Sequence, residues 1–134
     1  MPVLIARLLG AGLTGAMGWI HLQLWLDGYR EVPVVGILFL LNAIGAVALA
    51  TALLLAPGRL LGAAAVVTAV FTAGTLAGLV LSLTVGLFGV HESLQTPLVA
   101  ATLIVESAGV LVLVRTSVAV SRCKCSPNPP ASGR

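Results

Sequence analysis

The segment AVALATALLLAPGRLLGAAAVVTAV, residues 46–70, decides the fold. Two apolar runs meet in it, with only Pro57, Gly58 and Arg59 between them. A proline and a glycine favour the end of one helix, and so short a link makes the two helices antiparallel neighbours. Each run continues far enough to cross a hydrocarbon layer, which takes about 20 apolar residues. The segment therefore predicts a helical hairpin inside a membrane.

The composition of the whole chain extends this prediction. Of the 134 residues, 59% are hydrophobic and 8% are charged, whereas roughly a quarter are charged in an ordinary soluble domain. A soluble bundle would need a polar stripe along each helix, and no apolar segment has one. We expect an all-α fold, a four-helix transmembrane bundle over residues 1–120 with the lipid bilayer as its partner. The expected spans are about 3–26, 34–56, 60–89 and 98–120.

The basic residues predict the orientation. With four spans, only Arg30 lies at one end, and the other end holds Arg7, Arg59, Arg115, Arg122, Lys124 and Arg134. Basic residues collect on the cytoplasmic side, so we expect a cell-membrane protein with both termini in the cytoplasm. The first span lacks a cleavage site, and we interpret it as a retained helix. The net charge of +3 reflects topology, and no basic patch indicates a nucleic-acid partner.

The C-terminal segment SRCKCSPNPPASGR, residues 121–134, differs from the rest. It has three prolines and no apolar period, which predicts a disordered cytoplasmic tail. Cys123 and Cys125 lie in it, and their spacing leaves three alternatives: a soft metal ion such as Cu(I), acylation, or reduced thiols without a role.

The second and fourth spans resemble each other. When Pro33 is aligned with Pro97, PVVGILFLLNAIG matches PLVAATLIVESAG, and Asn42 falls opposite Glu106. These two are the only strongly polar residues of the aligned stretches. The match predicts two repeated helical hairpins related by an axis along the membrane normal. Coincidence within an apolar alphabet is the alternative.

Small residues recur every four positions in two spans. Residues four apart share a helix face, and small side chains there let backbones approach closely. We therefore predict a helix-packing seam, and a contact with a second copy or a larger membrane complex is the alternative. The seam residues are Gly10, Gly18, Gly74, Gly78 and Gly86.

The polar residues within the spans define a candidate site. Counted inward from the predicted outer helix ends, they fall in the outer half of the bundle, where an ionisable group faces the interior or a wet cavity. The candidate intramembrane polar pocket consists of His21, Asn42, Ser82 and Glu106, with His91 and Glu92 at its outer mouth. The alternative is that Asn42 and Glu106 join helices through a hydrogen bond. Such a bond contributes only about 0.6 kcal/mol to stability, which is a modest reason to bury a carboxyl group. Because an ionised carboxylate is costly in hydrocarbon, we expect Glu106 to be neutral.

No motif indicates catalysis. The sequence has no Ser-His-Asp set, phosphate-binding glycine loop or zinc-ligand spacing, and we expect no cofactor and no metal within the spans. His21 and His91 differ by about 8 Å in expected depth, which disfavours haem ligation. Two functions remain open. The first is a non-enzymatic accessory or assembly module, and the second is a small proton- or cation-linked transporter that uses the polar pocket.

Two stretches, HLQLWLDGYREVPVVGILFLLNAIG and LSLTVGLFGVHES, resemble those of small four-span bacterial integral membrane proteins without an assigned function. The topology and the P-x-x-G-x-L start of the second span are also similar to DoxX-type four-span proteins. The resemblance covers most of residues 10–110. It implies the four-span fold and assigns no role to any residue.

Overall fold

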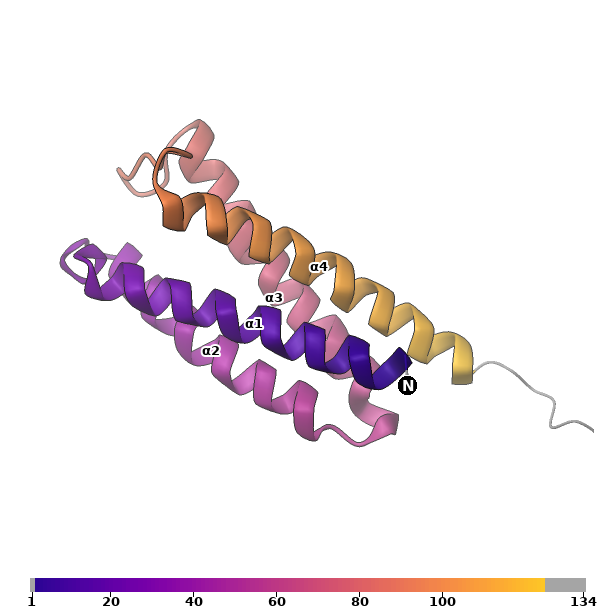
Figure 1. The fold of residues 1–134 in the computed structure, drawn as a ribbon. Coiled ribbons are helices and arrows are strands. Elements are labelled where there is room, and N and C mark those ends of the chain that lie inside the picture. Colours follow the sequence, from indigo (N-terminus) through magenta and orange to yellow (C-terminus); the bar gives the residue numbers. More distant parts are fainter. Residues whose placement is uncertain (1, 125–134) are drawn as a thin grey trace, which may run out of the picture.

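The computed structural model describes residues 2–124, most of which lie in four long helices (Figure 1). The helices are α1 (Pro2–Leu26), α2 (Val35–Leu55), α3 (Gly58–Thr84) and α4 (Pro97–Lys124). A short 3-10 helix, η1 (Tyr29–Glu31), lies in the first loop. Helix α4 continues into the segment expected to be a disordered tail, and Cys125 and the remaining tail lie outside the described residues, as does the side chain of Cys123.

All four helices are long and apolar enough to cross a membrane. Their outward faces are aliphatic: Ile37, Val70 and Ile104 are each at least 65% exposed. In water such a surface would drive association, whereas in a bilayer it contacts lipid. The predicted all-α, four-helix transmembrane bundle is confirmed, and the chain is an integral membrane protein.

The helices form two antiparallel hairpins, α1–α2 and α3–α4. Helix α1 packs against α2 and α4, and α3 packs against α4, whereas α2 and α3 share few contacts. One end of the bundle carries the loops 27–34 and 85–96, and we call it the loop end; the other, the terminal end, carries Pro2, Pro57 and Lys124. Figure 1 shows the two hairpins apart at the loop end. The short link at Pro57 makes α2 and α3 consecutive and antiparallel, but it does not pack them along their length.

The two predicted seam glycines of α1, Gly10 and Gly18, lie against other helices. A Cβ atom added at Gly18 would come within 2.6 Å of the Cβ of Ala46 in α2. One added at Gly10 would come within 3.0 Å of the Leu113 side chain in α4. Glycine at these positions therefore allows the close approach of α1 to both neighbours.

The glycines of α3 differ from the expected seam. A Cβ atom at Gly74 would meet nothing within 4 Å, and one at Gly78 would meet only the Leu87 side chain at 3.8 Å. Gly86 lies beyond the end of α3, in a turn with a φ of +83°. Helix α3 packs through a different face, whose buried residues include Leu61, Ala65, Thr68 and Thr72.

Helix α3 ends at Thr84, five residues before the expected end of the third span at 89. Leu87 and Val90 exchange two backbone hydrogen bonds of 2.9 Å each, and the two residues between them, Phe88 and Gly89, have φ angles of +52° and +81°. This is the geometry of a tight reverse turn, and its residues are apolar, so hydropathy alone extended the span through it. We call residues 85–90 the cap turn.

The interior is divided along its length. An apolar core lies toward the terminal end and consists of Ala11, Leu53, Leu61, Ala65, Ala69 and Leu113. The buried candidate-site residues His21, Asn42, Ser82 and Glu106 lie nearer the loop end. The apolar core cluster therefore packs the terminal half of the bundle, and the candidate polar residues lie in the loop half.

Candidate functional site

A cavity of about 460 Å³ lies between α2 and α3 in the loop half of the bundle. All four helices contribute to its wall, which is mostly aliphatic and aromatic. Its polar lining comes from His21 of α1, Asn42 of α2, Thr75 and Ser82 of α3, Thr102 of α4, and Glu92 of the loop between α3 and α4. At its floor, the ring of Phe71 fits against Gly45, where an added Cβ atom would come within 2.8 Å of the ring. A mostly apolar cavity with a few convergent polar groups is the usual form of a small-molecule site.

The carboxyl group of Glu106 lies beside this cavity and is fully buried. Its Oε1 is 3.9 Å from Nε2 of His21, which is beyond hydrogen-bond distance. Neither carboxyl oxygen has a hydrogen-bond partner among residues 2–124. The hydroxyl of Thr75 lies near this carboxyl group and donates to the Thr72 carbonyl oxygen at 2.8 Å. Glu106 is therefore a buried acid held next to an imidazole without being bonded to it.

His21 is held on two sides. Its Nδ1 lies 2.9 Å from the carbonyl oxygen of Met17, so this nitrogen carries a proton and donates it. In the neutral ring the other nitrogen, Nε2, is then an acceptor that faces Glu106. The ring also meets Phe39 edge-on, with centroids 5.2 Å apart. These contacts fix which nitrogen faces Glu106.

Asn42 is 6% exposed and its Oδ1 is also unpaired within the described chain. The buried threonines behave differently, because each donates to the carbonyl oxygen four residues earlier in its own helix at 2.7–2.9 Å. They are Thr14, Thr68, Thr72, Thr102 and Thr116. Within residues 2–124, unpaired buried side-chain oxygens thus occur only at Asn42 and Glu106, both next to the cavity.

The cavity is covered at the loop end. The Ser82 hydroxyl donates to the Val90 carbonyl oxygen at 3.1 Å, and the Glu92 amide donates to the Ser82 carbonyl oxygen at 3.3 Å. These bonds hold the cap turn over the end of α3, so that Leu87 and Val90 line the cavity from above.

A side-chain bond joins the two loops. The hydroxyl of Tyr29 donates to the carboxylate of Glu92, and the Tyr29 ring stacks at a tilt on Phe39, with centroids 4.9 Å apart. Partial burial, together with the bond to Glu92 and its negative charge, raises the pKa of the Tyr29 hydroxyl. The phenol therefore stays a donor throughout the physiological pH range.

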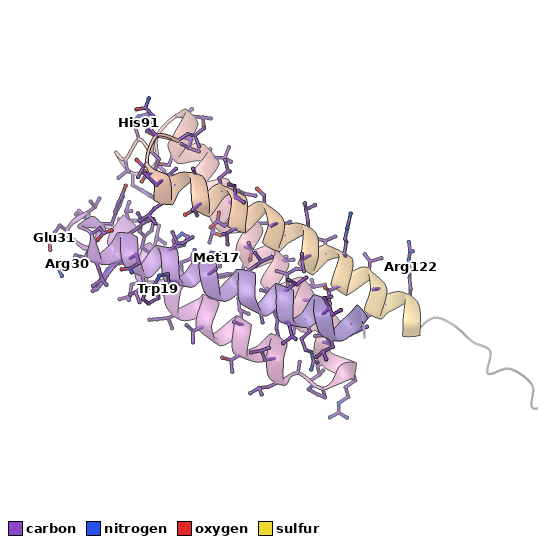
Figure 2. The ribbon with its side chains drawn as sticks, viewed as in Figure 1. Met17, Trp19, Arg30, Glu31, His91 and Arg122 are labelled. Atoms are coloured by element: carbon purple, nitrogen blue, oxygen red, sulfur yellow. The ribbon has the colours of Figure 1, made fainter. Side chains whose placement is uncertain are left out.

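The predicted site residues divide into three groups. His21, Asn42 and Ser82 line the cavity, and Glu106 lies behind His21. Of the expected mouth residues, Glu92 lines the cavity, whereas His91 is exposed and projects from the loop end (Figure 2). The imidazole of His91 lies over Gly86 on the outside of the cap turn.

Sequence reasoning missed several lining residues. Thr75 and Phe39 were not singled out, and Gly74 and Gly78 were interpreted as a packing seam although they line the cavity. Two small residues one turn apart on a face indicate low side-chain volume, and this signal is the same for a seam and for a cavity wall. Across residues 2–124, no three His, Cys, Asp or Glu side chains lie close enough together to hold a metal ion.

The fold and site describe a four-span membrane protein with an intramembrane cavity beside which the oxygens of Asn42 and Glu106 have no hydrogen-bond partner within the described residues. Comparison with protein-family models, curated proteins and solved structures finds no match to this chain, the DoxX-type proteins included.

Proposed function

We propose that this protein is a non-enzymatic membrane module that binds a small molecule in the cavity between α2 and α3. With the termini in the cytoplasm, as the basic residues predict, the loop end faces outward and the cavity lies in the outer half of the membrane. Binding of a small molecule is a specific form of the accessory role expected from the sequence. The protein holds a molecule within the bilayer and changes none of its bonds.

One observation carries the proposal: the buried oxygens of Asn42 and Glu106 are unpaired beside a cavity. An unpaired buried polar group costs about 1–3 kcal/mol. The same chain satisfies every buried threonine within its own helix, so the unpaired oxygens are a local exception. A bound molecule that donates hydrogen bonds to these oxygens would offset this cost. If the two side chains served only to join helices, their oxygens would be paired with groups of another helix.

Native mass spectrometry of the protein, extracted from its membrane in a mild detergent, tests the proposal. We expect a fraction of wild-type molecules to carry an additional mass that is released at higher collision energy. Asn42→Leu should lower this fraction, because it removes a polar contact inside the cavity. Thr72→Val is the matched control, since its hydroxyl is bonded within α3. Identical adducts on wild type and Asn42→Leu, or none on wild type, would contradict the proposal.

A second candidate function, proton- or cation-linked transport, is favoured by the pair formed by His21 and Glu106. An acceptor nitrogen 3.9 Å from a buried carboxyl can take up its proton after a small approach. In liposomes that contain the protein and a pH-sensitive dye, transport predicts a proton flux that Glu106→Gln abolishes. A binding module predicts no flux in wild type, and glutamine at this position should preserve the bound mass.

A further inference from the structure

The cavity opens sideways. Three of its lining residues also face outward on the bundle: Leu38 and Leu41 of α2 are 45% and 57% exposed, and Val70 of α3 is 68% exposed. Leu41 and Val70 lie more than one helical turn inside their helices. Residues at that depth meet hydrocarbon and not water. The few contacts between α2 and α3 leave this flank of the cavity uncovered.

Residues of the cap turn lie over the cavity at the loop end. Leu87 and Val90 of the cap turn lie over the cavity, and the bond between Tyr29 and Glu92 joins the loops beside it. A water-soluble molecule that arrived from the loop end would meet these groups first. A molecule dissolved in the bilayer would meet only the gap between α2 and α3.

Two glycines of α3 lie at the gap between α2 and α3. Gly74 and Gly78 line the cavity, and a side chain at either would meet almost nothing. At Gly18, by contrast, glycine is required by contact with α2. The space beside Gly74 and Gly78 is therefore available to an apolar body.

The polar groups restrict the head of the ligand. Asn42 Oδ1 and His21 Nε2 are acceptors on residues that line the cavity, so they select a hydrogen-bond donor. Among the described residues that line the cavity there is no lysine or arginine, which disfavours a phosphate or carboxylate head. A hydroxyl group meets both conditions.

We propose that the ligand is an uncharged, membrane-soluble alcohol that enters from the bilayer between α2 and α3. Its hydroxyl group donates to Asn42 Oδ1 or to His21 Nε2, and its apolar body lies along Gly74 and Gly78. This inference rests on the proposed binding function and specifies its ligand and its route.

Photolabelling tests this inference. The protein is placed in lipid nanodiscs with a diazirine derivative of hexadecanol or with the corresponding diazirine fatty acid, irradiated, and digested for mass spectrometry. We expect the alcohol to label residues 38–42 and 70–78 above the level at Ile104 and Leu111, whose exposed side chains report ordinary lipid contact. Gly78→Leu should abolish the excess by filling the cavity, and Asn42→Leu should lower it about tenfold, as expected for one lost hydrogen bond. Gly12→Leu is the matched control, because Gly12 also has nothing within 4 Å and does not line the cavity.

The outcomes separate this inference from the proposed function. Equal labelling by the alcohol and the fatty acid would refute the choice of an uncharged donor. Uniform labelling around the bundle, while wild type still carries a mass that Asn42→Leu loses, would refute entry of an alcohol from the bilayer and leave the binding function standing. Uniform labelling together with no bound mass would overturn both.

Discussion

Replacing the unpaired polar residues should stabilise the ligand-free protein. In Asn42→Leu, a side chain of similar volume removes a buried oxygen that has no partner within the described chain. Glu106→Met removes two such oxygens. If the variants stay folded as the wild type is, the free energy of unfolding rises because the folded state no longer carries the desolvation cost.

The size of this effect follows from the number of unpaired atoms. One unpaired buried group costs about 1–3 kcal/mol, so we expect Asn42→Leu to add about 1–2 kcal/mol to the free energy of unfolding. For a chain of this length that corresponds to a melting temperature about 3–6 °C higher. Glu106→Met should produce at least as large a rise.

The assay is thermal unfolding in detergent, followed by circular dichroism at 222 nm after extensive washing to remove bound molecules. Thr72→Val is the control, and it should shift the melting temperature by less than Asn42→Leu, since the hydroxyl it removes is bonded to the carbonyl of Thr68. A lower melting temperature for both Asn42→Leu and Glu106→Met would refute the reasoning. It would mean that these side chains hold the helices together.

Four further predictions concern other parts of the molecule. Tyr29 is the chain's one tyrosine, so absorbance at 295 nm reports its ionisation alone. The pKa of Tyr29 is raised in the folded protein. The bond to Glu92 therefore contributes fully to the stability of the fold below the ordinary tyrosine pKa of about 10, and this contribution is lost as pH rises through the pKa of the folded protein. We expect tyrosinate to appear only well above pH 10, and Glu92→Gln should shift its appearance to lower pH; an unshifted titration in wild type would contradict this. Gly18→Leu should lower the melting temperature strongly, because a Cβ atom there would overlap Ala46 in α2, and an unchanged value would mean that α1 and α2 are farther apart. Infrared difference spectra of wild type and Glu106→Gln should show a protonated-carboxyl band that is absent from the variant, since hydrocarbon disfavours the ionised form; loss of a carboxylate band alone would indicate a hydrated or cation-filled site. A membrane-impermeant thiol reagent should fail to label the two tail cysteines in intact cells, and rapid labelling would reverse the orientation.

The fold was predictable from the sequence because a bilayer imposes a length and an apolar surface on every span. The boundary of α3 was not, because Gly86 and Phe88 leave the helix within a run that stays apolar. Hydropathy measures transfer into lipid and carries no information on where the backbone turns.

The site was predictable in part for a similar reason. Polar groups in a span turn inward, which brought His21, Asn42 and Glu106 to one region. The role of Gly74 and Gly78 depends on whether another helix covers them, and their spacing alone does not contain that information. The bond between Tyr29 and Glu92 joins residues 63 positions apart, so only the packing of the two hairpins shows it.

An experimental density map of the protein in nanodiscs made from its own membrane tests the central claim most directly. The account predicts non-protein density in the cavity between α2 and α3, within hydrogen-bond distance of Asn42 and continuous with the gap beside Gly74 and Gly78. A map in which α2 and α3 close against each other, with Asn42 bonded directly to Glu106, would contradict it.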